Sequence, residues 1–475
     1  MSQTDLHYLP AHRALEMFRA KTLSPVEHLQ AMIDRADEVE PKVNAFTYTY
    51  FDEAMSAARA AEEKYASGQD TRPLEGLAIG IKDESDVKGK HTSNGSLLLK
   101  DNIATSTSPM NEHIFRAGGI MHARTATPEF SGTVITNSKL WGVTRNPWNL
   151  SQTPGGSSGG SSASLASGTS ALCTGSDIGG SIRVPSSTCG LYGLKPTYGR
   201  NPTDSPFNLD GYAVDGPMAR TAKDMILLQN AMCGPHPKDI VSLRPKLEIS
   251  TELQSIKGWK IAYSPDLGFY NVSDEVRRNT EAALDVLREA GAIVEQVDLS
   301  WTIDVLQGAM GHLNHLMGTY LAPMAEKDPD LLMPYTQAHI ENAKKSTAAK
   351  FLHAAEVENG MYSKLSKIFA DYRLLVCPTT GIPSVPADGD GVTDEIFING
   401  NRVHPLTGWV LTLPFNMLCR CPVVSAPSGI SSSGVPTGIQ IVGHTYSDQD
   451  VCRAAMAYEH VRGSGFCSAQ QQPAL

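Results

Sequence analysis

The sequence predicts an α/β fold in which helices cover a sheet that contains parallel strands. Its clearest sign is a strand–helix–strand unit: residues 259–263 form a short strand, Ser273 begins a helix that Gly291 terminates, and residues 293–298 form the next strand. Two strands joined through a helix pair in parallel, and the helix covers their sheet. The length of 475 residues exceeds what one core usually holds, so it requires two domains or one large α/β domain.

The first seventy residues predict a helical N-terminal region, 1–70. Residues 24–27 (SPVE) combine three features of a helix start: a serine that caps a free N–H, a proline suited to the first turn, and a glutamate that reaches back. Residues 43–50 alternate like a strand, and residues 52–67 form an alanine-rich helix. This region therefore brings helices and one strand to the edge of the fold.

Strands and helices continue to alternate along the chain. Residues 303–372 carry few strand signals and many Leu, Met, Ala and His residues, so we expect a helical segment that covers a pocket. Residues 391–405 contain an Asn-Gly turn between apolar runs, which predicts a hairpin. Further strands are predicted at 77–82, before Thr125, at 374–377 and at 437–442, and a closing helix at 448–462.

The composition excludes several classes of protein. Forty Lys and Arg residues against fifty Asp and Glu residues give a formal charge of −10, with no dense basic cluster, so binding of nucleic acid through phosphate contacts is not expected. No apolar stretch approaches the length of a membrane span, and the first ten residues lack the layout of a signal peptide. We therefore expect a soluble, cytoplasmic protein that binds neither nucleic acid nor membranes.

Neither the cysteines nor the histidines predict a metal site. The eight cysteines are too few for a disulfide scaffold, and the closest pair, Cys419 and Cys421, is separated by one residue. The fourteen histidines include no His-Glu-x-x-His pattern. His312 and His315 would share a helix face, which is more typical of a packed or solvated face than of metal ligands. We expect reduced thiols and no bound metal.

Two glycine-rich turns carry the strongest functional signal. Residues 154–162 (PGGSSGGSS) run straight into a helix-compatible segment, which argues against a flexible linker, and a second turn follows at 177–181 (DIGGS). Such turns point several backbone N–H groups at one spot, where they suit a developing negative charge, and a serine there provides a nucleophile. No histidine base accompanies these turns, so the candidate base is Lys82 at the end of strand 77–82.

Lys82 can serve as a base only if it spends time uncharged. An unperturbed lysine titrates near ~10.4, so work at pH 7–8 needs a downward shift of about 2–3 units, and burial supplies a shift of that sign. The alternative is an ordinary ion pair of Lys82 with the neighbouring Asp83 or with another carboxylate.

Three motifs in this order resemble those of the amidase signature family. They are 80–83 (GIKD), 155–160 (GGSSGG) and 175–185 (GSDIGGSIRVP). The resemblance continues in 142–148 (GVTRNPW), 189–197 (CGLYGLKPT) and the closing strand at 436–440 (PTGIQ). It implies a single domain over 1–475, with a large mixed, mostly parallel central sheet covered by helices on both faces. In that domain the catalytic core motifs occupy 77–200, and residues 303–372 form a helical cap-like segment.

By this resemblance the catalytic set is serine, cis-serine and lysine. Ser181 is the nucleophile, Ser157 is the bridging serine held by a cis peptide, and Lys82 is the base. Ser158 is the rival for the bridging role, and otherwise donates to Ser157 or to Lys82.

The resemblance also implies supporting and substrate-binding residues. Asp177 and Arg183 form a buried pair that braces the oxyanion loop, with ordinary structural roles as the alternative. The oxyanion is expected to be held by the backbone N–H groups of Ile178, Gly179, Gly180 and Ser181. The residues expected to bind substrate are Phe130, Ser131 and Gly132, together with Trp409 and Asn416. The last two follow the predicted hairpin at 391–405 in a region expected to wall an apolar pocket, with a core position as the alternative for its apolar residues.

The leading hypothesis is hydrolysis of a non-peptidic carboxamide, with an aryl or medium-sized apolar group, through a Ser181 acyl-enzyme and without a cofactor. We expect a small-molecule amide or carbamate as substrate and a monomer or homodimer. One alternative is a carbamate (urethane) hydrolase. Another is the glutaminase subunit of a tRNA-dependent amidotransferase, against which the unusual residues 123–130 and the insertion near 391–405 argue. A catalytically silent binding module is a third, and it loses force because all three catalytic residue types are present.

Overall fold

One eleven-stranded sheet runs through the molecule, whose computed structural model describes residues 3–326, 328–463 and 465–475. The strands of this sheet are β1 (Phe46–Thr49), β2 (Ala78–Lys82), β3 (Ile120–Thr125), β6 (Leu172–Asp177), β7 (Tyr192–Lys195), β8 (Val214–Ala219), β9 (Lys260–Tyr263), β10 (Ile293–Gln296), β11 (Leu374–Pro378), β14 (Val423–Ile430) and β15 (Pro436–Gly443). Their order across the sheet is β1-β3-β2-β6-β8-β7-β14-β15-β11-β9-β10. Two small hairpins stand apart from it, β4 (Asn137–Ser138) with β5 (Gly142–Val143) and β12 (Ile396–Ile398) with β13 (Asn401–Val403).

The sheet is mixed, as predicted, and its parallel pairing is confined to two blocks. The strands β3, β2 and β6 pair in parallel, and so do β11, β9 and β10. The strands between these blocks, and β1 at the edge, pair antiparallel. The parallel pair β9–β10 is the predicted strand–helix–strand unit, so that expectation is confirmed.

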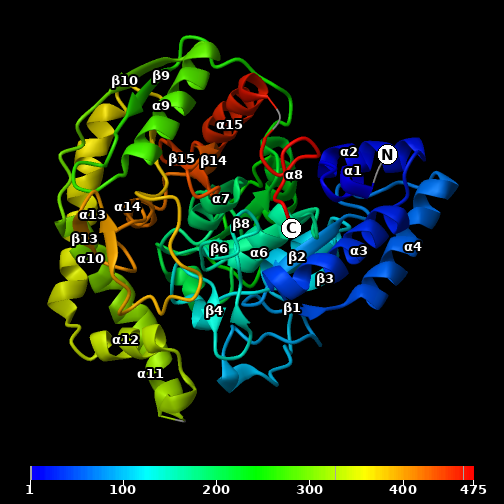
Figure 1. Cartoon of the computed structure of the whole chain (residues 1–475), viewed down its shortest axis with the longest axis horizontal. Coiled ribbons are helices and arrows are strands. Elements are labelled where there is room, and N and C mark those ends of the chain that lie inside the picture. Colours follow the sequence, from blue (N-terminus) through cyan, green and yellow to red (C-terminus); the bar gives the residue numbers. More distant parts are fainter. Residues whose placement is uncertain (1–2, 327, 464) are drawn as a thin grey trace.

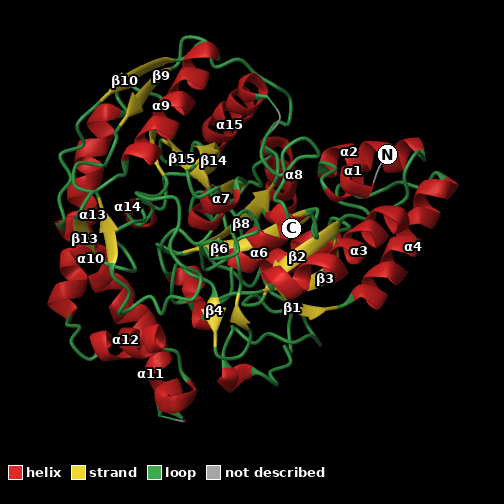
Figure 2. Cartoon of the chain, viewed as in Figure 1, coloured by secondary structure: helices red, strands yellow, loops and turns green. Residues whose placement is uncertain are grey.

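Helices lie on both sides of the sheet (Figure 2). They are α1 (Gln3–His7), α2 (Ala11–Ala20), α3 (Pro25–Val43), α4 (Phe51–Ser67), α5 (Pro109–Arg116), α6 (Gly159–Ser167), α7 (Arg183–Cys189), α8 (Ala222–Met232), α9 (Asp274–Glu289), α10 (Asp304–Leu313), α11 (Thr319–Ala325), α12 (Pro334–Ala343), α13 (Ala348–Ile368), α14 (Pro414–Met417) and α15 (Asp448–Arg462). Helices α1–α4 gather at one end of the molecule and α10–α13 at the other, with the sheet between them (Figure 1). The expected helical N-terminal region and helical cover segment are both present.

The strand β11 shows why helices cover both faces of the sheet. Its residues are fully buried, and successive side chains point to opposite faces. Leu374 and Val376 belong to a core that includes residues of α8, α9 and α15. Leu375 and Cys377 belong to a second core that includes residues of α10, α13 and α14. Hence the sheet separates two apolar cores, and each needs its own layer of helices.

Two predicted helix starts, at Ser24 and Ser273, are confirmed in position, and the capping hydrogen bonds predicted for Ser24 are present. Ser24 precedes α3, its hydroxyl accepts from the Glu27 N–H at 3.1 Å, and the Glu27 carboxylate accepts from the Ser24 N–H at 2.9 Å. Ser273 precedes α9, but its side chain makes no capping bond. Gly291 follows α9 with φ +94°, a conformation that glycine adopts without strain.

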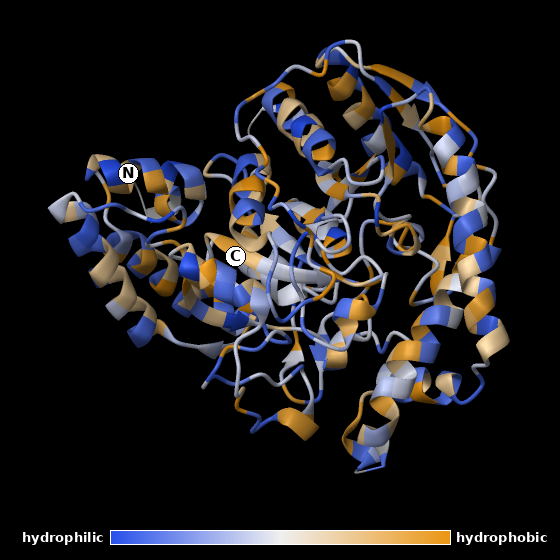
Figure 3. Ribbon diagram, turned by 180° about the vertical axis from the view of Figure 1, so that it is seen from behind, coloured by the Kyte–Doolittle hydropathy of each residue, from blue (hydrophilic) through white to orange (hydrophobic). Residues whose placement is uncertain are grey.

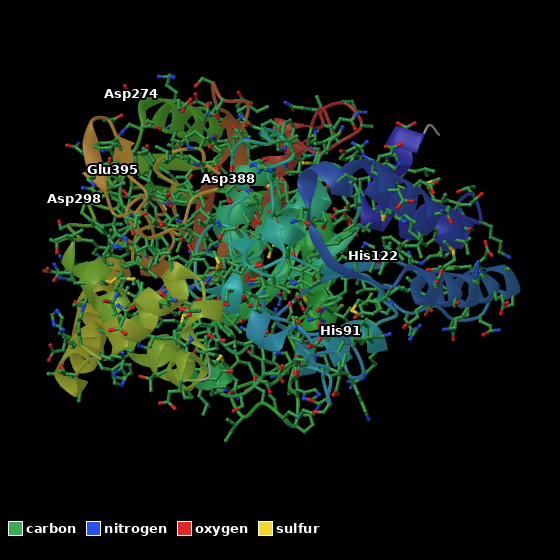
Figure 4. The ribbon with its side chains drawn as sticks, turned by 60° about the horizontal axis from the view of Figure 1, so that its bottom comes forward. His91, His122, Asp274, Asp298, Asp388 and Glu395 are labelled. Atoms are coloured by element: carbon green, nitrogen blue, oxygen red, sulfur yellow. The ribbon has the colours of Figure 1, made fainter. Side chains whose placement is uncertain are left out.

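The outer surface is polar and acidic. Several helices carry hydrophilic and hydrophobic residues side by side, as amphipathic helices do (Figure 3). The acidic residues Asp274, Asp298, Asp388 and Glu395 are exposed, and His122 is buried (Figure 4). No helix in the described part of the chain is both long and apolar enough to cross a membrane.

Candidate active site

Lys82 ends the buried strand β2, between the parallel neighbours β3 and β6. Its side chain is 1% exposed. The Nζ atom lies 2.6 Å from Ser157 Oγ and 2.8 Å from Ser176 Oγ. The sheet therefore carries the lysine amine to one end of the strands and points it at two hydroxyl groups.

Ser157 lies in the glycine-rich turn that leads into α6. The Gly156–Ser157 peptide bond is cis. The next residue, Ser158, donates its backbone N–H to the Ser181 carbonyl at 3.2 Å, so the turns that carry Ser157 and Ser181 are directly adjacent. The Ser158 hydroxyl contacts the backbone of Ser176, at 3.4 Å from its oxygen and 3.3 Å from its nitrogen, rather than Lys82. The structure thus favours Ser157 over Ser158 as the partner of the lysine.

The environment of Lys82 combines burial with one nearby carboxylate. Burial lowers the pKa of Lys82, and the charge of Glu84 partly opposes this shift. Glu84 Oε2 lies 3.1 Å from Lys82 Nζ. The neighbouring Asp83 is turned away, because it accepts hydrogen bonds from Ser93 and lies 3.5 Å from Arg124. Of the two ion pairs considered from the sequence, the one with Asp83 therefore does not form, and the one with another carboxylate does, with Glu84.

The loop between β6 and α7 presents backbone N–H groups beside Ser181. In the described part of the chain, no hydrogen-bond partner is found for the N–H groups of Ile178, Gly179 and Ser181. The Gly180 N–H differs, because it donates to Asp177 Oδ1 at 2.8 Å. Gly180 has φ +123°, and a Cβ there would lie 2.0 Å from Thr412 Oγ1, so only glycine fits. Three of the four predicted N–H groups are thus free to bind an oxyanion.

Asp177 and Arg183 form a buried ion pair that holds this loop in place. Arg183 donates to Asp177 through Nε at 2.9 Å and through its terminal nitrogen at 2.8 Å, and both side chains are fully buried. Burial by itself would raise the pKa of Asp177, but the charge and hydrogen bonds of Arg183 and the amide of Asn416 outweigh it and lower the pKa. Asn416 also donates to Asp177 Oδ1 at 2.8 Å. Hence Asp177 stays charged and holds the loop.

Replacing Arg183 by alanine is expected to lower the free energy of unfolding by about 3–5 kcal/mol, because it leaves the buried Asp177 carboxylate unpaired. Arg402→Ala is the matched control: its pair with Glu395, at 3.3 Å, is 65% and 63% exposed, and such pairs contribute about 0–1 kcal/mol. Urea unfolding of both variants measures the difference. An equal loss in the two variants would contradict the bracing role.

A pocket opens in front of Ser181. Its walls come from the 131–134 segment, the oxyanion loop, α10 and the turn that follows it, α12, and the segment 406–413. The lining residues are Ser131, Gly132, Thr133, Val134, Ile178, Gly179, Ser181, Met310, Leu313, Met317, His339, Leu406, Thr407, Val410 and Leu413. The segment 303–372, expected to cover a pocket, supplies four of these side chains.

The substrate-binding residues predicted from the sequence divide into two groups. Ser131 and Gly132 line the pocket, whereas Phe130, Trp409 and Asn416 are not among its lining residues. Phe130 packs in a core with Leu321, Leu332 and Ile340. Trp409 is fully buried and donates its indole N–H to the Pro405 carbonyl at 2.9 Å. These two aromatic side chains therefore belong to the hydrophobic core. Asn416 belongs to the group that holds the oxyanion loop, because its amide donates to Asp177.

Sequence reasoning missed Ser176, Glu84 and His339. Ser176 stands inside the 175–185 motif, next to Asp177, and Glu84 stands directly after the 80–83 motif, so both carried a local signal. His339 has no such signal: Nε2 donates to the Gly132 carbonyl at 2.8 Å, and only the fold brings α12 to that loop. Burial lowers the pKa of His339. This neutral imidazole holds a wall of the pocket in place.

His312 and His315 have separate partners. His312 Nε2 lies 2.7 Å from Asp210 Oδ1, and His315 Nδ1 lies 2.9 Å from Ser346 Oγ. Within residues 3–326, 328–463 and 465–475, no group of three or more His, Cys, Asp or Glu side chains is arranged to hold a metal ion.

Comparison with known proteins places the chain in a family. A family model for amidases matches residues 27–452. An acylamidase of Rhodococcus erythropolis is 32% identical over 478 residues, covering 97% of each chain. A glutamyl-tRNA(Gln) amidotransferase subunit of Carboxydothermus hydrogenoformans is 30% identical over 486 residues, covering 96% of this chain and 97% of the relative. The crystal structure of a bacterial aryl acylamidase of the amidase signature family has a TM-score of 0.89 at 27% identity, covering 96% of each chain.

The fold and the three motifs define a hydrolase of amide bonds. The chain belongs to the amidase signature family, and it is an amidase.

Proposed function

We propose that this amidase hydrolyses a non-peptidic carboxamide with an aryl or medium-sized apolar group, through an acyl-enzyme on Ser181. The observation that supports the proposal best is the 2.6 Å contact between the buried Lys82 amine and the Ser157 hydroxyl, in a turn adjacent to that of Ser181. Burial lowers the pKa of Lys82, and the uncharged amine, in contact with one serine, can deprotonate a second serine through it.

In the proposed first half-reaction, neutral Lys82 accepts the Ser157 proton while Ser157 accepts the Ser181 proton. Ser181 Oγ forms a bond to the carbonyl carbon, and the carbonyl oxygen becomes an oxyanion. The same relay then runs backwards and protonates the amide nitrogen, the C–N bond breaks, and the amine leaves. A water molecule attacks the acyl-enzyme in the second half-reaction, releases the acid and returns the proton to Ser181.

The oxyanion binds to the N–H groups of Ile178, Gly179 and Ser181. Removal of one such donor costs about 3–4 kcal/mol of transition-state stabilisation in well-studied enzymes. The Gly180 N–H is committed to Asp177, so its role is to fix the loop rather than to contact the substrate. The brace by Arg183 keeps the three donors aligned without movement during the reaction.

The chemistry of the pocket supports an apolar substrate. Most of its lining side chains are Met, Leu, Val or Ile, and none of the lining residues found in the described chain is Asp, Glu, Lys or Arg. Free glutamine carries an ammonium and a carboxylate group, and burial of these charges without partners is costly. The pocket therefore favours an aryl or alkyl amide over glutamine, the substrate required of an amidotransferase glutaminase.

A carbamate is the second candidate substrate. It meets the same nucleophile and the same oxyanion donors, and only the intermediate changes from an acyl-enzyme to a carbamoyl-enzyme. We propose that the enzyme acts in the cytoplasm as a monomer or homodimer, without a metal, a cofactor or a further protein component.

Purified alone, the enzyme is expected to release arylamine from anilides and ammonia from aryl carboxamides, with or without EDTA. A panel of anilides, aliphatic amides, aryl carbamates and glutamine, followed by amine and ammonia detection, measures the preference. Glutamine should be hydrolysed at least about tenfold more slowly than the best anilide, which corresponds to about 1.4 kcal/mol. Activity that requires a second, different polypeptide, or that prefers glutamine, would favour the amidotransferase alternative.

A further inference from the structure

Glu84 connects the candidate base to the wall of the pocket. Its carboxylate Oε2 lies 3.1 Å from Lys82 Nζ. The Ser131 hydroxyl donates to the same oxygen, and Ser131 lines the pocket in front of Ser181. One carboxylate thus contacts both the amine that is proposed to move protons and a residue beside the substrate.

Three carboxyl groups raise the pKa of the Lys82 amine: Glu84 from the loop after β2 most strongly, then Asp215 from β8 and Asp177 from β6. Asp177 is committed to Arg183. Burial, and then the nearby Glu84 charge, raise the pKa of Asp215 well above its usual range, whereas the pKa of Glu84 is lowered, so Glu84 ionises more readily than Asp215. The charge that acts on Lys82 at close range is therefore that of Glu84.

Glu84 itself remains ionised. Burial would raise its pKa, but the Lys82 charge and hydrogen bonds from Ser131 and Ser176 lower it below the usual range. An ionised carboxylate 3.1 Å from an amine favours the ammonium form of that amine. Burial and Glu84 therefore act on Lys82 in opposite directions.

We propose that Glu84 is a positioning residue for the amidase reaction: it holds the Lys82 amine against Ser157, and its charge sets the pH range in which that amine is available as a base. The inference rests on the proposed function, because it assumes that Lys82 is the base. It also gives Glu84 a role after proton transfer, since the carboxylate pairs with the ammonium that Lys82 becomes when it accepts the serine proton.

The charge is tested by Glu84→Gln, which keeps the size of the side chain and its capacity to accept hydrogen bonds. An opposite charge at this distance shifts a pKa by about 1–3 units. The rising limb of kcat/KM against pH, measured with the best anilide, should therefore move about 1–3 pH units lower in Glu84→Gln. Asp215→Asn is the matched control: Asp215 acts on the pKa of Lys82 in the same direction as Glu84 but less strongly, so its limb should move by less than that of Glu84→Gln.

An unchanged or higher limb in Glu84→Gln, or an equal shift in Asp215→Asn, would overturn the inference. If turnover is too slow to measure, the pH dependence is taken instead from the rate at which a fluorophosphonate labels Ser181. A folded Glu84→Gln variant that is not labelled at any pH would also overturn the inference. If Glu84→Gln does not fold, Glu84→Asp withdraws the charge by one methylene, and its limb should move in the same direction by a smaller amount. A different result would contradict the proposed function itself: a wild-type kcat/KM that does not rise with pH, or a Lys82→Ala variant whose kcat/KM still rises with pH.

Discussion

Replacement of Ser181 by alanine is expected to abolish amide hydrolysis, with a loss in kcat of about 10⁴- to 10⁶-fold, because the atom that forms the acyl-enzyme is removed. The three free N–H groups remain, so substrate still binds and KM changes little. Initial rates with the best anilide measure the loss. Intact-protein mass spectrometry after addition of a fluorophosphonate should show one adduct on wild type and none on the variant.

Ser186→Ala is the matched control for Ser181→Ala. Ser186 is a fully buried serine of α7, and its hydroxyl has no hydrogen-bond partner in the described part of the chain. Its replacement should leave the rate within about threefold of wild type, since a surplus hydroxyl contributes nothing to the reaction. A fluorophosphonate adduct on another serine, or substantial activity of Ser181→Ala, would contradict the assignment of the nucleophile.

Replacement of Lys82 by alanine is expected to lower kcat/KM by several orders of magnitude and to remove its dependence on pH. Burial lowers the pKa of Lys82, so the uncharged form becomes populated below the usual range of a lysine. Activity in wild type therefore rises as pH increases through this lowered pKa, because deprotonation creates the base. Without the amine, no titrating base remains to accept the serine proton, so kcat/KM no longer rises with pH. Rate measurements across pH 5–10 test both effects.

A second buried lysine provides the control for Lys82. Lys195 is fully buried in β7, and its Nζ donates to the Cys421 carbonyl at 2.9 Å. Lys195→Met should lower the free energy of unfolding while the rising limb stays in place. If Lys82→Ala behaved in the same way, losing stability and keeping the limb, Lys82 would be a structural lysine.

The parts of the site that could be predicted are those that depend on local backbone. A glycine-rich turn with a serine brings its own N–H groups to its own hydroxyl, so the two turns are recognisable from a few adjacent residues, whereas the choice of Ser157 and Ser181 within them rests on the resemblance to the amidase signature family. Lys82 is recognisable because it follows a continuous apolar strand. The geometry agrees, since the Lys82 amine contacts Ser157. The roles of these residues in catalysis stay predictions until the variants are measured.

The pocket could not be predicted, because its walls come from segments far apart in the chain. Met310 and His339 meet Ser131 only after α10 and α12 pack against the sheet. Trp409 was predicted from its place after the hairpin at 391–405, and an apolar side chain there suits a core position as well as a pocket. The charge partner of Lys82 stayed open between Asp83 and another carboxylate, because Asp83 and Glu84 are adjacent in sequence and only the turn after β2 decides which one faces the amine.

The strands in the middle of the sheet were the hardest elements to foresee. Residues 172–177 form β6, although they include Gly175, Thr174 and Ser176, and they show no alternation because most of them are buried on both faces. The strand β8 contains Gly216 and Pro217. Small residues are needed here because neighbouring elements approach closely: a Cβ at Gly175 would lie 2.9 Å from Ser158 Oγ. The close packing that builds the site thus removes the hydropathy pattern that marks a strand.

The groups proposed to react stand on the ends of β2 and β6 and on the turns beside them, whereas the opposing wall of the pocket is supplied by α10, α12 and the 406–413 segment. The two parts are joined where Thr412 donates to the Gly179 carbonyl and His339 donates to the Gly132 carbonyl, so the side chains best suited to exchange are the apolar ones. Substitutions at Met310, Met317 or Leu406 would reshape what the enzyme accepts and leave the bond-breaking apparatus intact. A scaffold so partitioned is a good starting point for redirecting hydrolysis toward bulkier synthetic compounds.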